Sequence, residues 1–452
     1  MNAPQPESTA QLTLRLSALA APMLGEQIFN FLIGFYDTYL AGTISREVTA
    51  AVGTGAYFGW FLTLGFAVVT TGVGALISRA IGARDLPWAN RVLRQGVVIS
   101  LLIGALLSVV VFQNANAIAS AFSQTSAARG FSRLFLKIDA WGYVFASVTF
   151  VATAALRAAG NARAPLILMA CVAVLNAVVS TALVQGWYDV PLGVEGIALG
   201  TLFARVCGAA GAMALLLIGQ RGIRLNPFGS WFDREAIVRL LRVGLPAGGE
   251  AAFLFAAQLS FIWLVARSAT GDAATTNFAA HMIAIRLEAI SFLPAVAWMT
   301  AAAALAGQSI GAGEPQRAER IGHLAAMLGA ASCAVVGGSM FFFSPIIYEH
   351  MTRDAGVREI GARVLPFMGL MQPVLGAGLI YAGTLRGVGD TRATMLISLI
   401  CSVGLRVPLA AIGIHTVGGL LGAWLGMFAD NSCRALLSAL RFRQGAWKRL
   451  RV

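Results

Sequence analysis

Twelve long apolar stretches dominate this chain of 452 residues and leave few folds open to it. Each is about 20 residues or longer, the length that an α-helix needs to cross the hydrocarbon core of a bilayer. Charged residues make up 12% of the chain, whereas soluble domains carry about 25%. We therefore predict an all-α integral membrane protein, and the absence of strand-like alternation argues against a membrane barrel. The predicted spans are 17–41, 50–78, 95–120, 134–156, 164–186, 193–218, 243–267, 276–307, 323–348, 361–385, 394–414 and 418–440.

The sequence contains the same unit twice. The segment that opens at Pro22 is echoed by one that opens at Pro246, a shift of 224 positions (246 minus 22). The motif at 156–161 recurs at 385–390, a shift of 229 (385 minus 156). Six spans per copy is an even number, so both copies share one orientation and form two six-helix lobes related as parallel repeats, an arrangement typical of secondary transporters. The predicted domains are an N-terminal lobe (1-220), a cytoplasmic linker (221-242) with an amphipathic helix at 231–242, a C-terminal lobe (243-440) and a basic cytoplasmic tail (441-452).

The net charge of +13 does not indicate nucleic-acid binding, because the basic residues gather in alternate short loops between apolar spans. In these positions they determine the membrane topology. Loops rich in Arg and Lys stay on the cytoplasmic side, which predicts that both termini are cytoplasmic. The basic tail is expected to touch anionic lipid. The five cysteines are isolated and no Walker A lysine is present, so neither a metal site, a disulfide framework nor ATP hydrolysis is indicated.

Charged side chains inside predicted spans are the candidate functional residues, because a lipid-facing charge is costly. Asp37 lies in the first span, 15 positions after Pro22 (37 minus 22), and that proline interrupts the backbone hydrogen bonds of its helix. A carboxyl that alternates between charged and neutral forms is what proton coupling requires. Asp37 is therefore the candidate coupling residue and Pro22 the candidate bending site. The alternative is a fixed charge satisfied by neighbouring amides.

Further candidates lie in both halves. Glu26 and Glu250 occupy matching positions, which indicates a shared structural role such as accepting backbone N–H groups; for Glu250 a cation contact is an equal alternative. Arg286 and Glu288 are two apart on one predicted helix and need different partners. Asn176 and Ser180 are four apart and share a helix face. His281, Asp139, Arg205, Arg406 and Asp430 are weaker candidates, for which burial or pairing is the simpler explanation.

These residues resemble the multidrug and toxic compound extrusion (MATE) family. The string from Asp37 to Ala51, the segments 161–165 and 193–201, and the second-half segments 307–319 and 385–392 resemble its ordered motifs along nearly the whole chain. The resemblance implies a V-shaped pair of six-helix lobes in the bacterial inner membrane and antiport of small organic, often cationic, compounds against H⁺ or Na⁺. It is strongest toward the proton-coupled, DNA-damage-inducible type of subfamily, and it assigns cation coupling to Asp37 and helix bending to Pro22. It also carries over the family's span-five asparagine to Asn176 and its span-six threonine to Thr201. Together with our other candidates, the predicted residues of the substrate or cation pathway are Tyr36, Asn176, Ser180, Thr201, Glu250, Arg286 and Glu288.

Two departures from the family pattern favour H⁺ over Na⁺. The family's second carboxylate, four residues after the span-five asparagine, is Ser180 here, and span ten contains no acid. We therefore predict a monomeric multidrug/H⁺ antiporter that is a secondary active transporter and not an enzyme, with no cofactor. The alternatives are Na⁺-coupled antiport and a flippase for lipid-linked oligosaccharide, the latter because of the intramembrane residues Arg205, Arg286 and Arg406.

Overall fold

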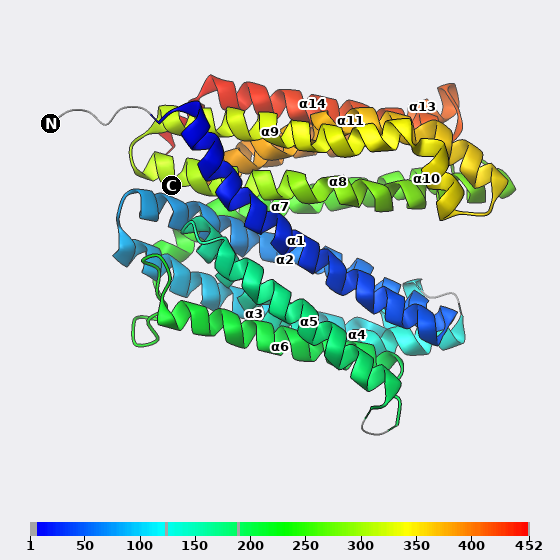
Figure 1. The fold of residues 1–452 in the computed structure, drawn as a ribbon, viewed down its shortest axis with the longest axis horizontal. Helices are drawn as coiled ribbons and strands as arrows, with labels where there is room; N and C mark the ends of the chain where they lie inside the picture. The colour runs from blue at the N-terminus through cyan, green and yellow to red at the C-terminus, as the bar shows by residue number, and fades with distance from the viewer. Residues whose placement is uncertain (1–6, 123–124, 188–189, 451–452) are drawn as a thin grey trace. The chain divides into compact units, whose positions relative to one another are not determined.

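The computed structural model describes residues 7–122, 125–187 and 190–450, and its long elements in this part of the chain are all helices (Figure 1). The prediction of an all-α membrane protein is confirmed. In chain order the helices are α1 (Thr9–Ile44), α2 (Arg46–Gly82), α3 (Leu86–Phe122), α4 (Ser126–Ala158), α5 (Arg163–Gln185), α6 (Val194–Ile218), α7 (Arg234–Ala266), α8 (Asp272–Gly311), α9 (Pro315–Phe342), α10 (Ser344–Met351), α11 (Ala355–Gly387), α12 (Thr391–Ser398), the π-helix η1 (Leu399–Arg406), α13 (Val407–Thr416), α14 (Gly419–Gln444) and the 3₁₀-helix η2 (Ala446–Arg449).

Eleven helical segments in the described chain are long and apolar enough to cross a membrane. One of them, Thr391–Thr416, is built from α12, η1 and α13 in succession. The twelfth predicted span corresponds to α14, which has 26 residues but carries Asp430, Asn431 and Arg434 near its middle. These three side chains are buried or half-buried. The polar centre of α14 therefore faces protein rather than lipid, as expected for intramembrane charges.

Two predicted boundaries differ from the structure. The span predicted at 323–348 ends earlier, because α9 stops at Phe342 and α10 starts at Ser344. Pro345 occupies the first turn of α10, a position that suits proline because its missing N–H has no intrahelical acceptor there. The amphipathic helix predicted at 231–242 is helical from Arg234 onward, but it is continuous with the following span. Residues 234–242 are the first turns of α7, which continues without a break to Ala266.

The chain divides into two compact units, and the divisions fall inside two helices. Unit 2 comprises Gly25–Gly244, and unit 1 combines the N-terminal stretch up to Leu24 with the chain from Leu245 onward. The first turns of α1 thus belong to unit 1 and the rest of α1 to unit 2. In α7 the order is reversed, because its first turns belong to unit 2 and the rest to unit 1. Each crossing lies within a few residues of a proline inside the helix, Pro22 in α1 and Pro246 in α7.

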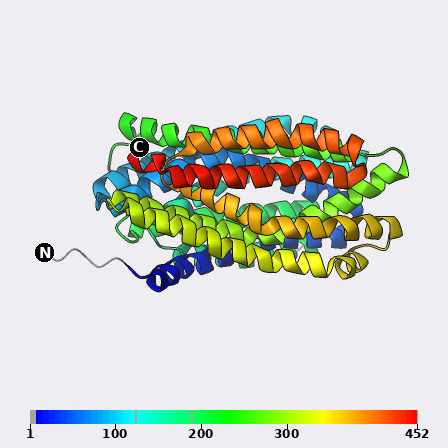
Figure 2. The same cartoon turned by 90° about the horizontal axis from the view of Figure 1, so that it is seen from above.

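Each unit is a bundle whose helices lie side by side along their length (Figures 1 and 2). In unit 2 the central helix is α4, which packs against α2, α3 and α6. In unit 1 the central helix is α11, which packs against α8, α9 and α14. Each is the fourth long helix of its repeat, so the duplicated sequence builds the same core arrangement in each unit.

Glycine allows the fifth and sixth helices of each repeat to approach closely. A Cβ at Gly200 of α6 would lie 2.7 Å from the backbone of Ser180 on α5. A Cβ at Gly426 of α14 would lie 2.5 Å from the backbone nitrogen of Ala410 on α13. Small residues at helix contacts are the usual means of close packing in a membrane, where van der Waals contact replaces the hydrophobic effect. In unit 2 this contact brings α5 and α6 together beside Asp37.

Candidate functional site

Asp37 is buried in unit 2, with 6% of its surface exposed. The helix that carries it packs through Leu40 and Ala41 into an apolar cluster with residues of α2, α4 and α6. Oδ2 of Asp37 accepts a hydrogen bond from the Thr201 hydroxyl at 2.9 Å. Oδ1 is buried and has no hydrogen-bond partner within the described chain. No arginine or lysine forms an ion pair with this carboxylate among the described residues, so its charge is not directly compensated.

Thr201 links Asp37 to Asn176. The amide nitrogen Nδ2 of Asn176 donates to the Thr201 hydroxyl at 3.1 Å. The same hydroxyl lies 3.0 Å from the carbonyl oxygen of Ile197, one turn back on α6. Because a hydroxyl has one hydrogen, it can donate either to Asp37 or to Ile197 at a given moment. The chain Asn176–Thr201–Asp37 is therefore a polar relay with one donor that can turn.

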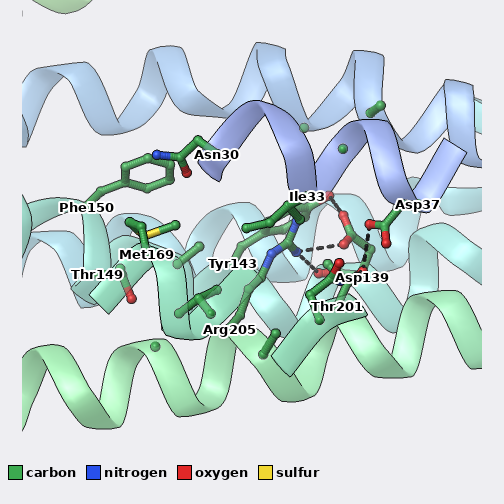
Figure 3. A pocket seen from close by; sticks show the side chains of 18 of the residues that line it. Asn30, Ile33, Asp37, Asp139, Tyr143, Thr149, Phe150, Met169, Thr201 and Arg205 are labelled. Atoms are coloured by element: carbon green, nitrogen blue, oxygen red, sulfur yellow. Dashed lines mark hydrogen bonds and ion pairs between the residues drawn. The ribbon is translucent and has the colours of Figure 1, made fainter. Parts of the chain in front are cut away.

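A cavity of about 320 Å³ lies beside this relay, entirely within unit 2 (Figure 3). Most of its lining is apolar, with Asp37, Asn176 and Thr201 among the few polar groups that face it. This volume falls at the lower end of the range of small-molecule sites, which pair apolar walls with a few placed polar groups. The cavity can therefore hold a small organic compound or a drug-sized fragment.

A second ionic group on the cavity wall joins α4 and α6. Nη1 of Arg205 donates to Oδ1 of Asp139 at 2.7 Å, and the Tyr143 hydroxyl donates to Oδ2 of Asp139 at 2.5 Å. The Arg205 guanidinium lies 5.5 Å from the centre of the Tyr143 ring. Asp139 and Arg205 are therefore paired, which agrees with the simpler explanation that the sequence favoured. Tyr143 was not predicted from the sequence. The only local sign of its role was Asp139, one helical turn away on α4.

Glu26, which also lines the cavity, pairs with Arg157 of α4. In unit 1, Glu250 pairs with Arg386 of α11 at 2.7 Å and also accepts a hydrogen bond from Thr394 at 2.7 Å. The matching roles expected for the two glutamates are present, but the donors are guanidinium groups rather than backbone N–H groups. Arg157 and Arg386 were not predicted as partners, although both stand inside the repeated motifs.

The remaining candidates are not among the residues that line the cavity. The Tyr36 hydroxyl hydrogen-bonds with Thr181 at 2.6 Å, and Ser180 lies against Gly200 with its Oγ buried and unpartnered within the described chain. Arg286 is exposed and Glu288 half-buried, and neither makes an ion pair among the residues described. Pro22 lies inside α1 at the edge of unit 1.

Two polar groups in unit 1 complete the set. His281 is buried between the rings of Phe261 and Trp424, with centroids 5.6 and 5.8 Å away, and neither ring nitrogen has a partner within the described chain. Arg406 pairs with Asp430 at 2.6 Å. This pair lies within unit 1, and pairing lowers the cost of placing the two charges in a membrane.

Comparisons with known proteins agree along the whole chain. A family model described as MatE matches residues 22–181 and 246–412. A probable multidrug resistance protein NorM from Thermotoga maritima is 27% identical over 451 residues, covering 99% of this chain and 95% of that protein. The multidrug resistance protein PmpM from Pseudomonas aeruginosa is 28% identical over 478 residues, covering 100% of this chain and 96% of that protein.

Solved structures show the same fold. The outward-facing conformation of a multidrug resistance MATE family transporter of the MOP superfamily has a TM-score of 0.86 at 20% identity, covering 96% of this chain and 95% of that one. A MOP superfamily transporter from Pyrococcus furiosus, described by a reversed polarity of its binding pocket, has a TM-score of 0.88 at 20% identity, covering 98% of this chain and 100% of that one. At 20% sequence identity, these two structures show that the fold is shared and say nothing about the substrate of this chain.

Proposed function

Since the chain belongs to the MatE family of multidrug and toxic compound extrusion transporters, we propose that it exports small organic compounds, cationic ones among them, by antiport against H⁺. The export would use alternating access across the inner membrane of a bacterium, with both termini in the cytoplasm. The multidrug resistance names of the NorM and PmpM relatives support drugs as substrates. The observation that carries the proposal is Asp37, a buried carboxylate on the cavity wall with no cationic partner among the described residues.

A lone carboxylate beside an apolar cavity suits exchange of one cation for another. When Asp37 is charged, an organic cation in the cavity supplies the missing opposite charge. When a proton binds Asp37, that attraction is removed and the cation is released. The Thr201 hydroxyl can follow this change, because it can turn from Asp37 to the carbonyl of Ile197 once the carboxyl is neutral. Bending of α1 near Pro22 would couple release to the change of access.

The proton gradient is large enough for this work. Moving one elementary charge inward yields about 2.3 kcal/mol per 100 mV of membrane potential. Each pH unit adds about 1.4 kcal/mol. One proton per cycle therefore supports roughly a hundredfold gradient of a neutral substrate at ordinary membrane potentials and pH gradients.

Na⁺ coupling is the second candidate, and one observation favours it. Asp37 Oδ1, Asn176 Oδ1 and Ser180 Oγ are buried oxygens without a hydrogen-bond partner in the described part of the chain. Hard cations bind oxygen ligands of this kind. The set contains a single negative charge, because Ser180 stands where the family pattern has a second carboxylate. That deficit is the reason for placing H⁺ first.

A flippase for an anionic, lipid-linked sugar is less well supported. Such a cargo has a net negative charge and no cationic group to place at Asp37, so it calls for a net positive charge around it. Of the three intramembrane arginines considered, Arg205 and Arg406 are each balanced by a carboxylate partner. The exposed Arg286 is the exception. Binding of a lipid-linked oligosaccharide to the purified protein would revive this alternative.

The deciding experiment measures ethidium efflux from proteoliposomes in which a pH gradient and a Na⁺ gradient are imposed separately. We expect wild-type efflux driven by the pH gradient alone and lost in Asp37→Asn. The matched control is Glu349→Gln, an exposed carboxylate on α10 that makes no ion pair within the described chain. Uphill export by Asp37→Asn would contradict the coupling role, and efflux driven only by Na⁺ would establish the second candidate.

A further inference from the structure

Arg205 presents unused hydrogen-bond donors to the cavity. It is the one basic side chain among the described residues that line the cavity, and 26% of its side chain is exposed against 3% for its partner Asp139 (Figure 3). Its hydrogen bonds within the described chain all come from Nη1, to Oδ1 of Asp139 at 2.7 Å and to the carbonyl oxygen of the same residue at 3.3 Å. A guanidinium has five N–H donors, so those on Nε and Nη2 remain available to a ligand.

The position of Arg205 is held by its neighbours. Asp139 has both carboxylate oxygens engaged, one by Arg205 and one by Tyr143. Gly142 leaves the space that the guanidinium needs, because a Cβ there would lie 2.6 Å from Nη1 of Arg205. The donors that face the cavity are therefore fixed in direction before any ligand arrives, which lowers the entropy lost on binding.

The cavity wall also carries an unpaired negative charge close to this positive one. Thr201, which donates to Asp37, and Arg205 are four residues apart on α6 and so lie on one face of the helix, about 6 Å apart along its axis. We propose that Arg205 is a specificity-determining residue that binds an acidic group of the substrate, so that the cavity selects compounds with both a cationic and an anionic group. This inference rests on the proposed export function.

The two charges discriminate between substrate classes. A zwitterion can place its ammonium group at Asp37 and its carboxylate at the Nε and Nη2 donors of Arg205, and the planar fork of arginine suits a carboxylate. A purely cationic compound of the same size meets Arg205 as a like charge. The ester of a zwitterion should therefore bind less well than the parent acid, although it is more apolar.

The test uses the wild-type protein with a matched pair of ligands. A fluoroquinolone that carries both an amine and a carboxylate is compared with its carboxyl methyl ester, in binding to purified protein and in transport by proteoliposomes. We expect the acid to bind about tenfold or more tightly than the ester, the effect of a hydrogen bond between charged groups. Equal binding, or tighter binding of the ester, would overturn the role of Arg205.

Two variants separate recognition from structural support. In Asp139→Asn the guanidinium loses its competing carboxylate, so the acid should bind more tightly and the ester more weakly. The double variant Asp139→Asn/Arg205→Gln removes both charges of this pair, so neither partner is left behind as an unpaired charge. We expect the preference for the acid to disappear, because the acid should bind more weakly and the ester more tightly than to wild type. Parallel weakening of both ligands in the double variant would show that the pair only supports the fold.

The outcomes also separate this inference from the proposed function. Transport of both ligands with no preference for the acid overturns the role of Arg205 and leaves export intact. Absence of transport of either ligand, and of ethidium, overturns the export function and this inference with it. If the double variant does not fold, the ligand pair on wild-type protein still decides the question.

Discussion

Arg386 donates from Nη1 to Oε1 of Glu250 at 2.7 Å, inside the helical bundle of unit 1. Arg157 and Glu26 make the corresponding pair in unit 2, and the arginines are 229 positions apart (386 minus 157). The duplication has thus kept a whole ion pair and not only one residue of it. The surroundings differ, because Oε2 of Glu250 accepts from Thr394, whereas Oε2 of Glu26 has no partner in the described chain.

Removing the arginine of the unit 1 pair should destabilise the protein strongly. Arg386→Ala leaves Glu250 buried and without its cation, which costs about 3–5 kcal/mol of unfolding free energy. Thermal or denaturant unfolding in detergent measures the loss. The double variant Glu250→Gln/Arg386→Gln should recover most of it, and Arg363→Ala, which removes an exposed pair with Glu359, should cost less than about 1 kcal/mol. If the double variant or Arg363→Ala lost as much stability as Arg386→Ala, this assignment would be contradicted.

The Thr201 hydroxyl is expected to be essential for transport. Thr201→Val removes the donor to Asp37 and the acceptor for Asn176 while it keeps the side-chain volume, and a lost hydrogen bond to a charged group weakens the site by about 1.5–3 kcal/mol. We expect export rates to fall at least tenfold. Thr201→Ser keeps the hydroxyl and should retain most of the activity. Full export by the valine variant would show that the relay is not needed.

Gly200 should tolerate no side chain. Gly200→Ala places a methyl group 2.7 Å from the Ser180 backbone, so α5 and α6 must separate, at a cost of about 1–3 kcal/mol for overpacking. Gly130→Ala is the matched control, since this glycine is exposed on α4 and a Cβ there meets nothing within 4 Å. That change should stabilise the protein by up to about 1 kcal/mol. In thermal unfolding we expect the melting temperature to fall for Gly200→Ala and to rise for Gly130→Ala.

The pair of Asp233 and Arg91 should make stability slightly dependent on pH in acid. Nε of Arg91 donates to Oδ2 of Asp233 at 2.6 Å, and this hydrogen bond lowers the pKa of Asp233 below its usual value. The charged form is thus favoured in the folded state, so the stabilisation is complete above pH 4 and is lost as the pH falls through the lowered pKa. Its size is no more than about 1 kcal/mol for an exposed pair. The unfolding free energies of wild type and Arg91→Gln should differ at pH 6, and the difference should shrink as the pH falls below 4.

Much of the fold was open to prediction because the signals are local. The apolar spans, the repeat and the loop charges each depend on residues near one another in the chain, and eleven helical segments capable of crossing a membrane follow them. The end of α9 was missed because Pro345 is compatible with an apolar span and still starts a new helix. The amphipathic helix predicted at 231–242 was not joined to the span that follows, because its polar pattern gave no sign that one helix continues through Pro246.

The candidate site was predicted only in part. Asp37 stood out because a carboxylate inside an apolar span needs an explanation. The family resemblance named Asn176 and Thr201, but the hydrogen bonds that link them to Asp37 were not predicted, because 164 residues separate Asp37 from Thr201 in the sequence. The sequence favoured pairing for Asp139 and for Arg205, but nothing in it indicated that they pair with each other or that the guanidinium lies on the cavity wall.

The sequence by itself determined that this protein is helical, lies in a membrane, contains a duplicated unit and carries a carboxylate in its first span. These properties depend on hydropathy, periodicity and repetition along the chain, and a bilayer permits few structures for such a pattern. The tertiary structure alone decided which buried carboxylates are paired with an arginine and which one, Asp37, has no cationic partner in the described chain. The reason is that the charge balance of a site is set by the packing of helices that are distant in sequence.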